Sequence, residues 1–183
     1  MSSCNNNTSE PNFGQAVIGA PGSGKSTYCS AMSDFLRTIK RLVAVVNLDP
    51  ANDYTNFEPQ IDIRELITIE DAMEFKILGP NGALLYCIEY LEQNIDWLCE
   101  KLNNFITQGY KYYIFDFPGQ IELFTHHRSV YSILNHLEKS LNFRLTAVNL
   151  VDSFYCSDSS KYIAALLTSL STMLKVENLF DQV

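Results

Sequence analysis

The sequence predicts an α/β fold in which helices cover both faces of a mainly parallel sheet. Short apolar runs alternate with longer stretches of helical character, and this order calls for right-handed crossovers between parallel strands. The runs are apolar almost throughout, as strands buried on both faces are. Three of them are followed by polar or glycine-rich segments, which places the candidate ligand-binding residues at one edge of the sheet.

The expected elements follow one another along nearly the whole chain. Strands are expected at 14–19, 42–48, 112–117 and 145–151, and helices at 25–40, 84–108, 130–141 and 159–174, with one or two short helices within 63–75. The tetrapeptide GPNG at 79–82 has the chemistry of a turn. We expect one domain over residues 13–183, preceded by a polar, disordered arm at 1–12.

The composition is that of an ordinary globular protein, with 46% hydrophobic and 19% charged residues among 183. The net charge of -8 disfavours direct binding of nucleic acid, because an acidic surface repels phosphate. No apolar run has the length of a membrane span. The five cysteines form no C-x-x-C pair, which favours free thiols in a reducing compartment. We therefore expect a cytoplasmic protein that contacts neither nucleic acid nor membrane directly.

The segment GAPGSGKS after the first strand matches the phosphate-loop pattern G-x-x-x-x-G-K-[ST] in full. Its residues are Gly19, Ala20, Pro21, Gly22, Ser23, Gly24, Lys25 and Ser26, and Thr27 follows them. The glycines let successive backbone N–H groups point at phosphate oxygens. Lys25 can reach the β- and γ-phosphates, and the Ser26 hydroxyl can ligate magnesium. The sequence therefore predicts a P-loop NTPase, a three-layer αβα sandwich.

Two further strand ends carry acidic residues. Asp116 ends the third strand and opens DFPGQ, the place of the metal-side carboxylate in P-loop NTPases. Gly119 can bring its N–H close to a γ-phosphate, and Gln120 either orients a water or is a solvated loop residue. Asp49 opens DPAND after the second strand, where it either polarises the attacking water or forms a turn.

Together these segments resemble the GPN-loop GTPase family. The resemblance is carried by FGQAVIGAPGSGKSTYC (13–29), VAVVNLDPAN (43–52), GPNG (79–82), DFPGQIELFTHH (116–127) and LTAVNLVDSFYCSD (145–158). It implies hydrolysis of GTP with Mg²⁺ and a dimer with a second copy or a paralogue. In that dimer Gly79, Pro80 and Asn81 would form a loop that enters the partner's active site. The resemblance also implies help in the assembly and nuclear localisation of RNA polymerases II and III, with polymerase subunits as partners and shuttling to the nucleus.

The end of the sequence departs from the family pattern. The Asn/Thr-Lys-x-Asp segment that reads guanine in this family is absent, as are the strand and the C-terminal helices around it. We therefore expect a domain that lacks its C-terminal part, with an exposed sheet edge and poor discrimination between GTP and ATP. Asp152 and Asp158 are the only nearby carboxylates that could take the place of the missing guanine-binding aspartate.

Two other functions are open on the sequence. A P-loop of this kind also begins small-molecule kinases, although DFPGQ, GPN and the lack of an Arg-rich lid disfavour that activity. The chain also fits a non-catalytic partner that docks onto a longer paralogue.

Overall fold

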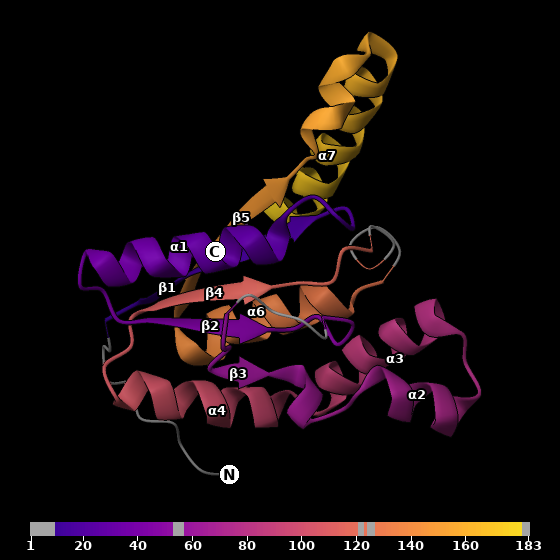
Figure 1. Cartoon of the computed structure of the whole chain (residues 1–183). Coiled ribbons are helices and arrows are strands. Elements are labelled where there is room, and N and C mark those ends of the chain that lie inside the picture. The colour runs from indigo at the N-terminus through magenta and orange to yellow at the C-terminus, as the bar shows by residue number, and fades with distance from the viewer. Residues whose placement is uncertain (1–9, 53–56, 121–122, 124–126, 181–183) are drawn as a thin grey trace.

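The computed structural model describes residues 10–52, 57–120, 123 and 127–180, the last six of these without their side chains. Within these residues five strands form one parallel sheet in the order β3-β2-β4-β1-β5 (Figure 1). They are β1 (Asn12–Gly19), β2 (Val43–Asn47), β3 (Ile61–Asp62), β4 (Tyr112–Asp116) and β5 (Phe143–Leu150). The predicted fold class is confirmed, and the sheet is parallel throughout.

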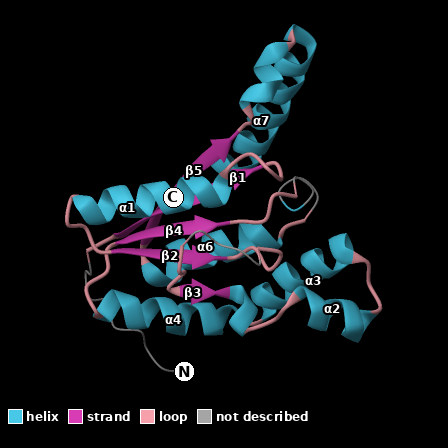
Figure 2. Cartoon of the chain, viewed as in Figure 1, coloured by secondary structure: helices cyan, strands magenta, loops and turns pink. Residues whose placement is uncertain are grey.

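Helices lie between β1 and β2, between β3 and β4, and between β4 and β5, whereas the described residues between β2 and β3 form no helix (Figure 2). The α-helices are α1 (Lys25–Thr38), α2 (Ile69–Lys76), α3 (Pro80–Gln93), α4 (Ile95–Thr107), α6 (Ser129–Leu141) and α7 (Ser159–Phe180), and the 3-10 helices are η1 (Ile63–Glu65) and η2 (Ser153–Ser157). None of the helices seen in the described part of the chain combines the length and the apolar character that a bilayer crossing requires.

The sheet carries a hydrophobic core on each face. Alternate residues of a strand point to opposite faces, so Val17 packs toward α1 whereas Ala16 and Ile18 pack toward the other side. The α1 side is the smaller core, and the opposite side holds the buried residues of α3, α4 and α6. The three layers of the predicted sandwich are therefore present, and the sheet holds the carboxyl ends of β1, β2 and β4 side by side.

Two local expectations were wrong. GPNG is not an isolated turn, because Gly79 is the N-cap and Pro80 the first residue of α3. Proline is favoured at that position, where its missing N–H costs no helical hydrogen bond. The helix expected over 84–108 is two helices that meet at Asn94, whose φ of -111° and ψ of 36° break the helical path.

The two ends of the sheet differ from the expected pattern in small ways. β3 was not expected, because two residues are too few to show a period. β1 begins at Asn12, whose side chain donates to the Leu141 carbonyl at 3.0 Å. Residue 12 therefore belongs to the folded domain and not to an arm. The expectation for residues 1–9 lies outside the described residues.

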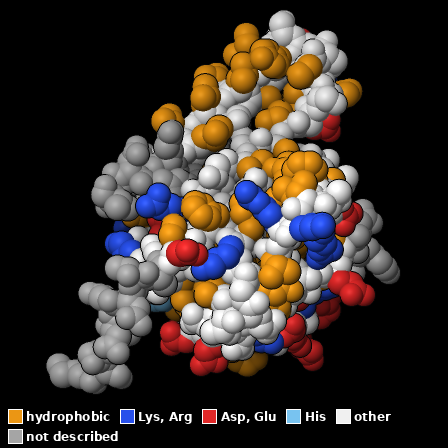
Figure 3. Space-filling model, turned by 90° about the vertical axis from the view of Figure 1, so that its left-hand side faces the viewer, with side chains coloured by type: hydrophobic (Ala, Val, Ile, Leu, Met, Phe, Trp, Pro, Cys, Tyr) orange, Lys and Arg blue, Asp and Glu red, His pale blue; other side chains and the backbone are white. Residues whose placement is uncertain are grey.

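The last helix, α7, projects away from the sheet (Figure 1). Seven of its large apolar side chains are 39% to 62% exposed: Tyr162, Ile163, Leu166, Leu167, Leu170, Met173 and Leu174. Figure 3 shows hydrophobic side chains gathered over this projecting part. Among the described residues β5 pairs with β1 alone, so the sheet has the exposed edge that the sequence predicted.

Candidate nucleotide and magnesium site

The phosphate loop connects β1 to α1, as its motif requires. Gly19 and Gly24 have φ values of 150° and 89°, in the region that favours glycine. A Cβ at Gly19 would lie 2.4 Å from the carbonyl oxygen of Leu150. Gly24 is the N-cap of α1 and no side chain caps this end. The first N–H groups of α1 are thus available to an anion, which the helix dipole also favours.

Lys25 is buried inside the loop, with 7% of its surface exposed. Its Nζ donates to the carbonyl oxygen of Ala20 at 3.1 Å, so the side chain folds back over the loop. Burial lowers the pKa of Lys25, while the carboxylates of Asp116 and Asp49 act against that shift. The ammonium group thus stays within the loop that the sequence predicts to bind phosphate.

Ser26 and Asp116 meet beneath the loop. The Ser26 hydroxyl donates to Asp116 Oδ2 at 2.9 Å. Asp116 is 1% exposed, and its Oδ1 is buried without a hydrogen-bond partner. Burial raises the pKa of Asp116 to about 6, although the bond from Ser26 and the charge of Lys25 lower it. A hydroxyl beside a carboxylate with one unpartnered oxygen is a donor set that suits Mg²⁺.

Ser26 and Asp116 do not belong to a larger metal-binding cluster in the described part of the chain. Across the described segments, no group of three or more His, Cys, Asp or Glu residues is placed to hold a metal ion. A cation that takes one or two protein oxygens and completes its shell with phosphate and water fits this arrangement. Ser26 and Asp116 are therefore the residues that fit the predicted magnesium site.

Asn52 is a residue of this site that the sequence reasoning missed. Its Nδ2 donates to Ser26 Oγ at 2.9 Å and lies 3.5 Å from Asp116 Oδ2. Asn52 is the fourth residue of the DPAND segment, which was singled out for Asp49 alone. The contact joins residues that lie 26 and 64 positions apart, so no local pattern indicates it.

Asp49 forms the turn that was one of its two predicted roles. Its Oδ1 accepts from the Ala51 N–H at 2.9 Å, two residues further on. Burial raises the pKa of Asp49, and its charge acts on both Lys25 and Asp116. Asp49 is thus within electrostatic reach of the loop lysine and the buried carboxylate. Its action on water stays a prediction.

Gly119 and Gln120 bring the DFPGQ loop against two other segments. A Cβ at Gly119 would lie 2.7 Å from Lys25 Nζ and 2.8 Å from the Pro21 nitrogen, so this loop touches the phosphate loop through bare backbone. Gln120 Nε2 donates to Asn81 Oδ1 of the same chain at 2.9 Å. Gln120 is therefore not a freely solvated side chain.

The GPN residues and Thr27 are more peripheral. Gly79, Pro80 and Asn81 are exposed at the start of α3, and Thr27 is exposed in the first turn of α1. The contact between Asn81 and Gln120 places the GPN segment beside the site of its own chain. Its predicted action in the site of a partner stays a prediction.

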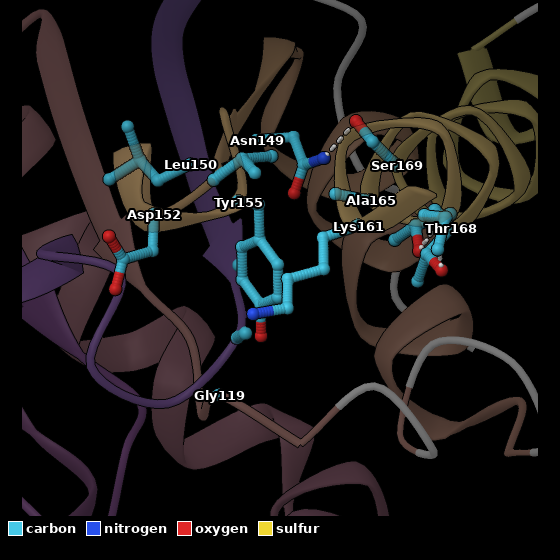
Figure 4. Close-up of a pocket in the computed structure, with 14 residues that line it drawn as sticks. Gly119, Asn149, Leu150, Asp152, Tyr155, Lys161, Ala165, Thr168 and Ser169 are labelled. Atoms are coloured by element: carbon cyan, nitrogen blue, oxygen red, sulfur yellow. Dashed lines mark hydrogen bonds between the residues drawn. The ribbon is translucent and has the colours of Figure 1, made fainter. Parts of the chain in front are cut away.

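A cavity of about 250 Å³ adjoins the phosphate loop between the end of β5, η2 and α7 (Figure 4). Gly19, Ala20 and Gly119 form part of its wall, and Asp152 lies at its edge. Asp152 accepts from the Phe154 N–H at 2.9 Å and caps η2. Asp158 does not line the cavity, and it accepts from the Ser160 N–H at 3.1 Å before α7. Both carboxylates thus have local structural partners.

The family model described as a conserved hypothetical ATP binding protein matches residues 17–180. "GPN-loop GTPase QQT1" of Arabidopsis thaliana is 57% identical over 165 residues, which are 90% of this chain and 55% of the relative. "GPN-loop GTPase 2" of Danio rerio is 56% identical over 165 residues, covering 90% of this chain and 52% of that protein. The chain therefore spans about half the length of the curated relatives it matches.

A solved structure agrees with these sequence relatives. The crystal structure of a GTPase from Pyrococcus abyssi in its apo form has a TM-score of 0.69 to this chain, with 28% sequence identity. The similarity covers 87% of this chain and 63% of that one. The matched region of the chain is thus similar in sequence to the curated relatives and similar in fold to this GTPase.

Proposed function

Because this chain belongs to the GPN-loop GTPase family, we propose that it binds GTP with Mg²⁺ and hydrolyses it. The observation that carries the proposal is the 2.9 Å bond between Ser26 and the buried Asp116 directly below a complete phosphate loop. Its relatives are named GTPases, as is its neighbour among solved structures. This geometry suits both tasks of the proposed site. The loop Gly19–Ser26 would bind phosphate, and Ser26 and Asp116 would bind the cation.

Each residue of the site has a defined task in this reaction. The N–H groups of the loop and of α1 hold the phosphate oxygens, and Lys25 adds a positive charge there. Mg²⁺, when bound, neutralises charge that develops on the phosphates. Asp49 and Gln120 lie in the loops that follow the neighbouring strands β2 and β4, and they orient the attacking water. Gly119 lets its loop approach the γ-phosphate.

Release of phosphate from GTP by the purified chain tests this proposal. We expect turnover that requires Mg²⁺ and that falls by at least about 100-fold in Ser26→Ala and Asp116→Asn, since phosphoryl transfer depends on positioning and charge. Asn103→Ala, at an exposed position of α4, is the control and leaves turnover unchanged. Equal turnover with and without the Ser26 hydroxyl would contradict the proposal. Transfer of the phosphate to a nucleoside instead of water would indicate a kinase.

We also propose that the chain acts as a dimer, with a second copy or a paralogue of the family. Two exposed apolar side chains support this: Phe75 is 75% exposed and Ile77 is 93% exposed, just before the GPN segment. Ile77 also has a φ of 54°, which a β-branched residue rarely adopts. Backbone strain and exposed apolar surface at the same place favour a contact with another chain. In that contact Asn81 would reach the phosphates bound by the partner.

The cellular role follows from family membership and not from geometry. We propose that the chain takes part in the assembly and nuclear localisation of RNA polymerases II and III, and that it resides in the cytoplasm and shuttles to the nucleus. Loss of nuclear polymerase staining after removal of the protein from cells, and its return with the wild-type chain, would support this role. Normal polymerase staining in depleted cells would contradict it.

A non-catalytic partner is the second candidate function, and the exposed apolar face of α7 favours it. A face of this kind on a monomer is typical of an interaction site. In this case the chain docks onto a longer paralogue and does not turn over GTP. Co-purification with such a paralogue that is lost in Leu167→Glu, together with no phosphate release by the isolated chain, would favour this function.

A further inference from the structure

Asn52 is the third polar group at the meeting point of Ser26 and Asp116. Its amide nitrogen lies 2.9 Å from Ser26 Oγ and 3.5 Å from Asp116 Oδ2. Both oxygens belong to the residues that fit a magnesium ion. The amide therefore contacts the Ser26 oxygen that a cation would need and lies close to the Asp116 carboxylate.

The hydrogen-bond pattern fixes which end of the amide faces the site. The Ser26 hydroxyl has one hydrogen, and it is directed to Asp116 Oδ2. Ser26 Oγ can therefore only accept from Asn52, so the NH₂ end of the amide must face it. The carbonyl end of Asn52 points elsewhere.

An N–H group and a dication compete for one oxygen. A hydroxyl oxygen has two lone pairs, and Asn52 takes one of them. The amide hydrogens carry partial positive charge, so a cation on the second lone pair would lie next to like charge in a partly buried site, where such repulsion is stronger than in bulk water. The other carboxylate oxygen of Asp116, Oδ1, is buried and has no hydrogen-bond partner. The amide therefore opposes a cation at the Ser26 oxygen, whereas Asp116 Oδ1 accepts no hydrogen bond that a cation would have to break.

We infer that the Asn52 amide is an internal competitor of the divalent cation, which must displace Asn52 from Ser26 and Asp116 in order to bind. A movement of Asn52 would also affect Asp49. The backbone N–H of Asn52 donates to the Asp49 carbonyl at 3.3 Å, and the Asp49 side chain accepts a hydrogen bond within the same turn. Loading of the cation is thereby coupled to the turn that carries Asp49. This inference rests on the proposed magnesium site.

Binding of Mn²⁺ to the full chain, measured by electron paramagnetic resonance without turnover, tests the inference. Mn²⁺ takes the same oxygen ligands as Mg²⁺. Asn52→Ala removes one hydrogen bond that the cation has to break, so we expect about two- to tenfold tighter binding. Asn52→Asp, which places a carboxylate there, is expected to bind tighter still. Asn103→Ala, an exposed residue of α4, is the matched control and leaves the affinity unchanged.

The outcomes separate this inference from the proposed function. Ser26→Ala is measured alongside, and it should weaken Mn²⁺ binding. If Ser26→Ala has no effect, the cation site itself is wrong and the proposed function fails with it. If Ser26→Ala weakens binding while Asn52→Ala leaves it unchanged or also weakens it, the cation site stands and the competition by Asn52 is refuted.

Discussion

Gly119→Ala adds one methyl group at the contact between the DFPGQ loop and the phosphate loop. The new Cβ would lie 2.8 Å from the Pro21 nitrogen and 2.9 Å from its Cα, and 2.7 Å from Lys25 Nζ. The end of the lysine can move, whereas the proline backbone belongs to the phosphate loop. Gly119 is not among the glycines with positive φ, so alanine brings a steric effect and no backbone strain.

The cost follows from that overlap. Contacts under 3.0 Å have to open by several tenths of an ångström, and overpacking of this kind destabilises by about 1–3 kcal/mol. We expect urea unfolding of the nucleotide-free chain to show a loss in this range. GTP affinity should fall at least about tenfold, because the displaced loop carries the N–H groups that hold the phosphates.

Gly82→Ala is the matched control. It lies in the first turns of α3, and the nearest atom to its added Cβ is a Leu78 side-chain carbon at 3.5 Å, an ordinary contact. Alanine is preferred over glycine in a helix by about 1 kcal/mol, so this variant should be slightly more stable with unchanged GTP affinity. If Gly119→Ala has the same urea unfolding free energy and the same GTP affinity as the wild type, the DFPGQ loop and the phosphate loop do not touch as described.

Four further outcomes are expected. Mixing Asn81→Ala with Lys25→Ala chains should restore some phosphate release, since one site of the mixed dimer keeps both parts, and no rescue in a proven mixed dimer would count against a trans role. Ile77→Asn should raise the free energy of unfolding by about 1 kcal/mol in urea, because asparagine tolerates its positive φ; no gain would mean that the site is unstrained. In EDTA, Asp116→Asn should raise the free energy of unfolding at pH 8 by at most about 3 kcal/mol, because the raised pKa of Asp116 makes the folded state lose stability as the pH rises through about 6. This gain should vanish near pH 4, and an equal effect at both pH values would exclude ionisation of Asp116 as its cause. ATP should compete with labelled GTP within about a hundredfold, or 2.7 kcal/mol, and a larger preference would reveal a guanine reader elsewhere.

The sequence predicted the parts of the site that lie in local motifs. The phosphate loop needs its glycines and lysine in fixed order, so eight adjacent residues suffice to place it. Asp116 was predicted because a buried strand directly precedes it. The convergence of three strand ends followed from the parallel topology, which brings the carboxyl ends to one edge.

The missed features depend on contacts between distant residues. Asn52 reaches Ser26 and Asp116 only through the folded turn after β2, and Asn81 meets Gln120 across 39 positions. The start of α3 at the GPN segment depends on packing of the following helix, since Pro and Gly fit a turn and a helix N-terminus equally well. The hydrophobic periodicity of the sequence does not indicate such contacts between distant residues.

Equilibrium titration of a non-hydrolysable GTP analogue into the purified chain, with Mg²⁺ present, tests the central claim most directly. Lys25 supplies a charge that the N–H groups of the loop cannot replace, and a charge-assisted hydrogen bond contributes about 1.5–3 kcal/mol. We therefore predict that the wild-type chain binds the analogue and that Lys25→Ala, shown to be folded by circular dichroism, binds it at least about tenfold more weakly. Equal affinity of the two chains would contradict the claim that the phosphate loop holds the nucleotide.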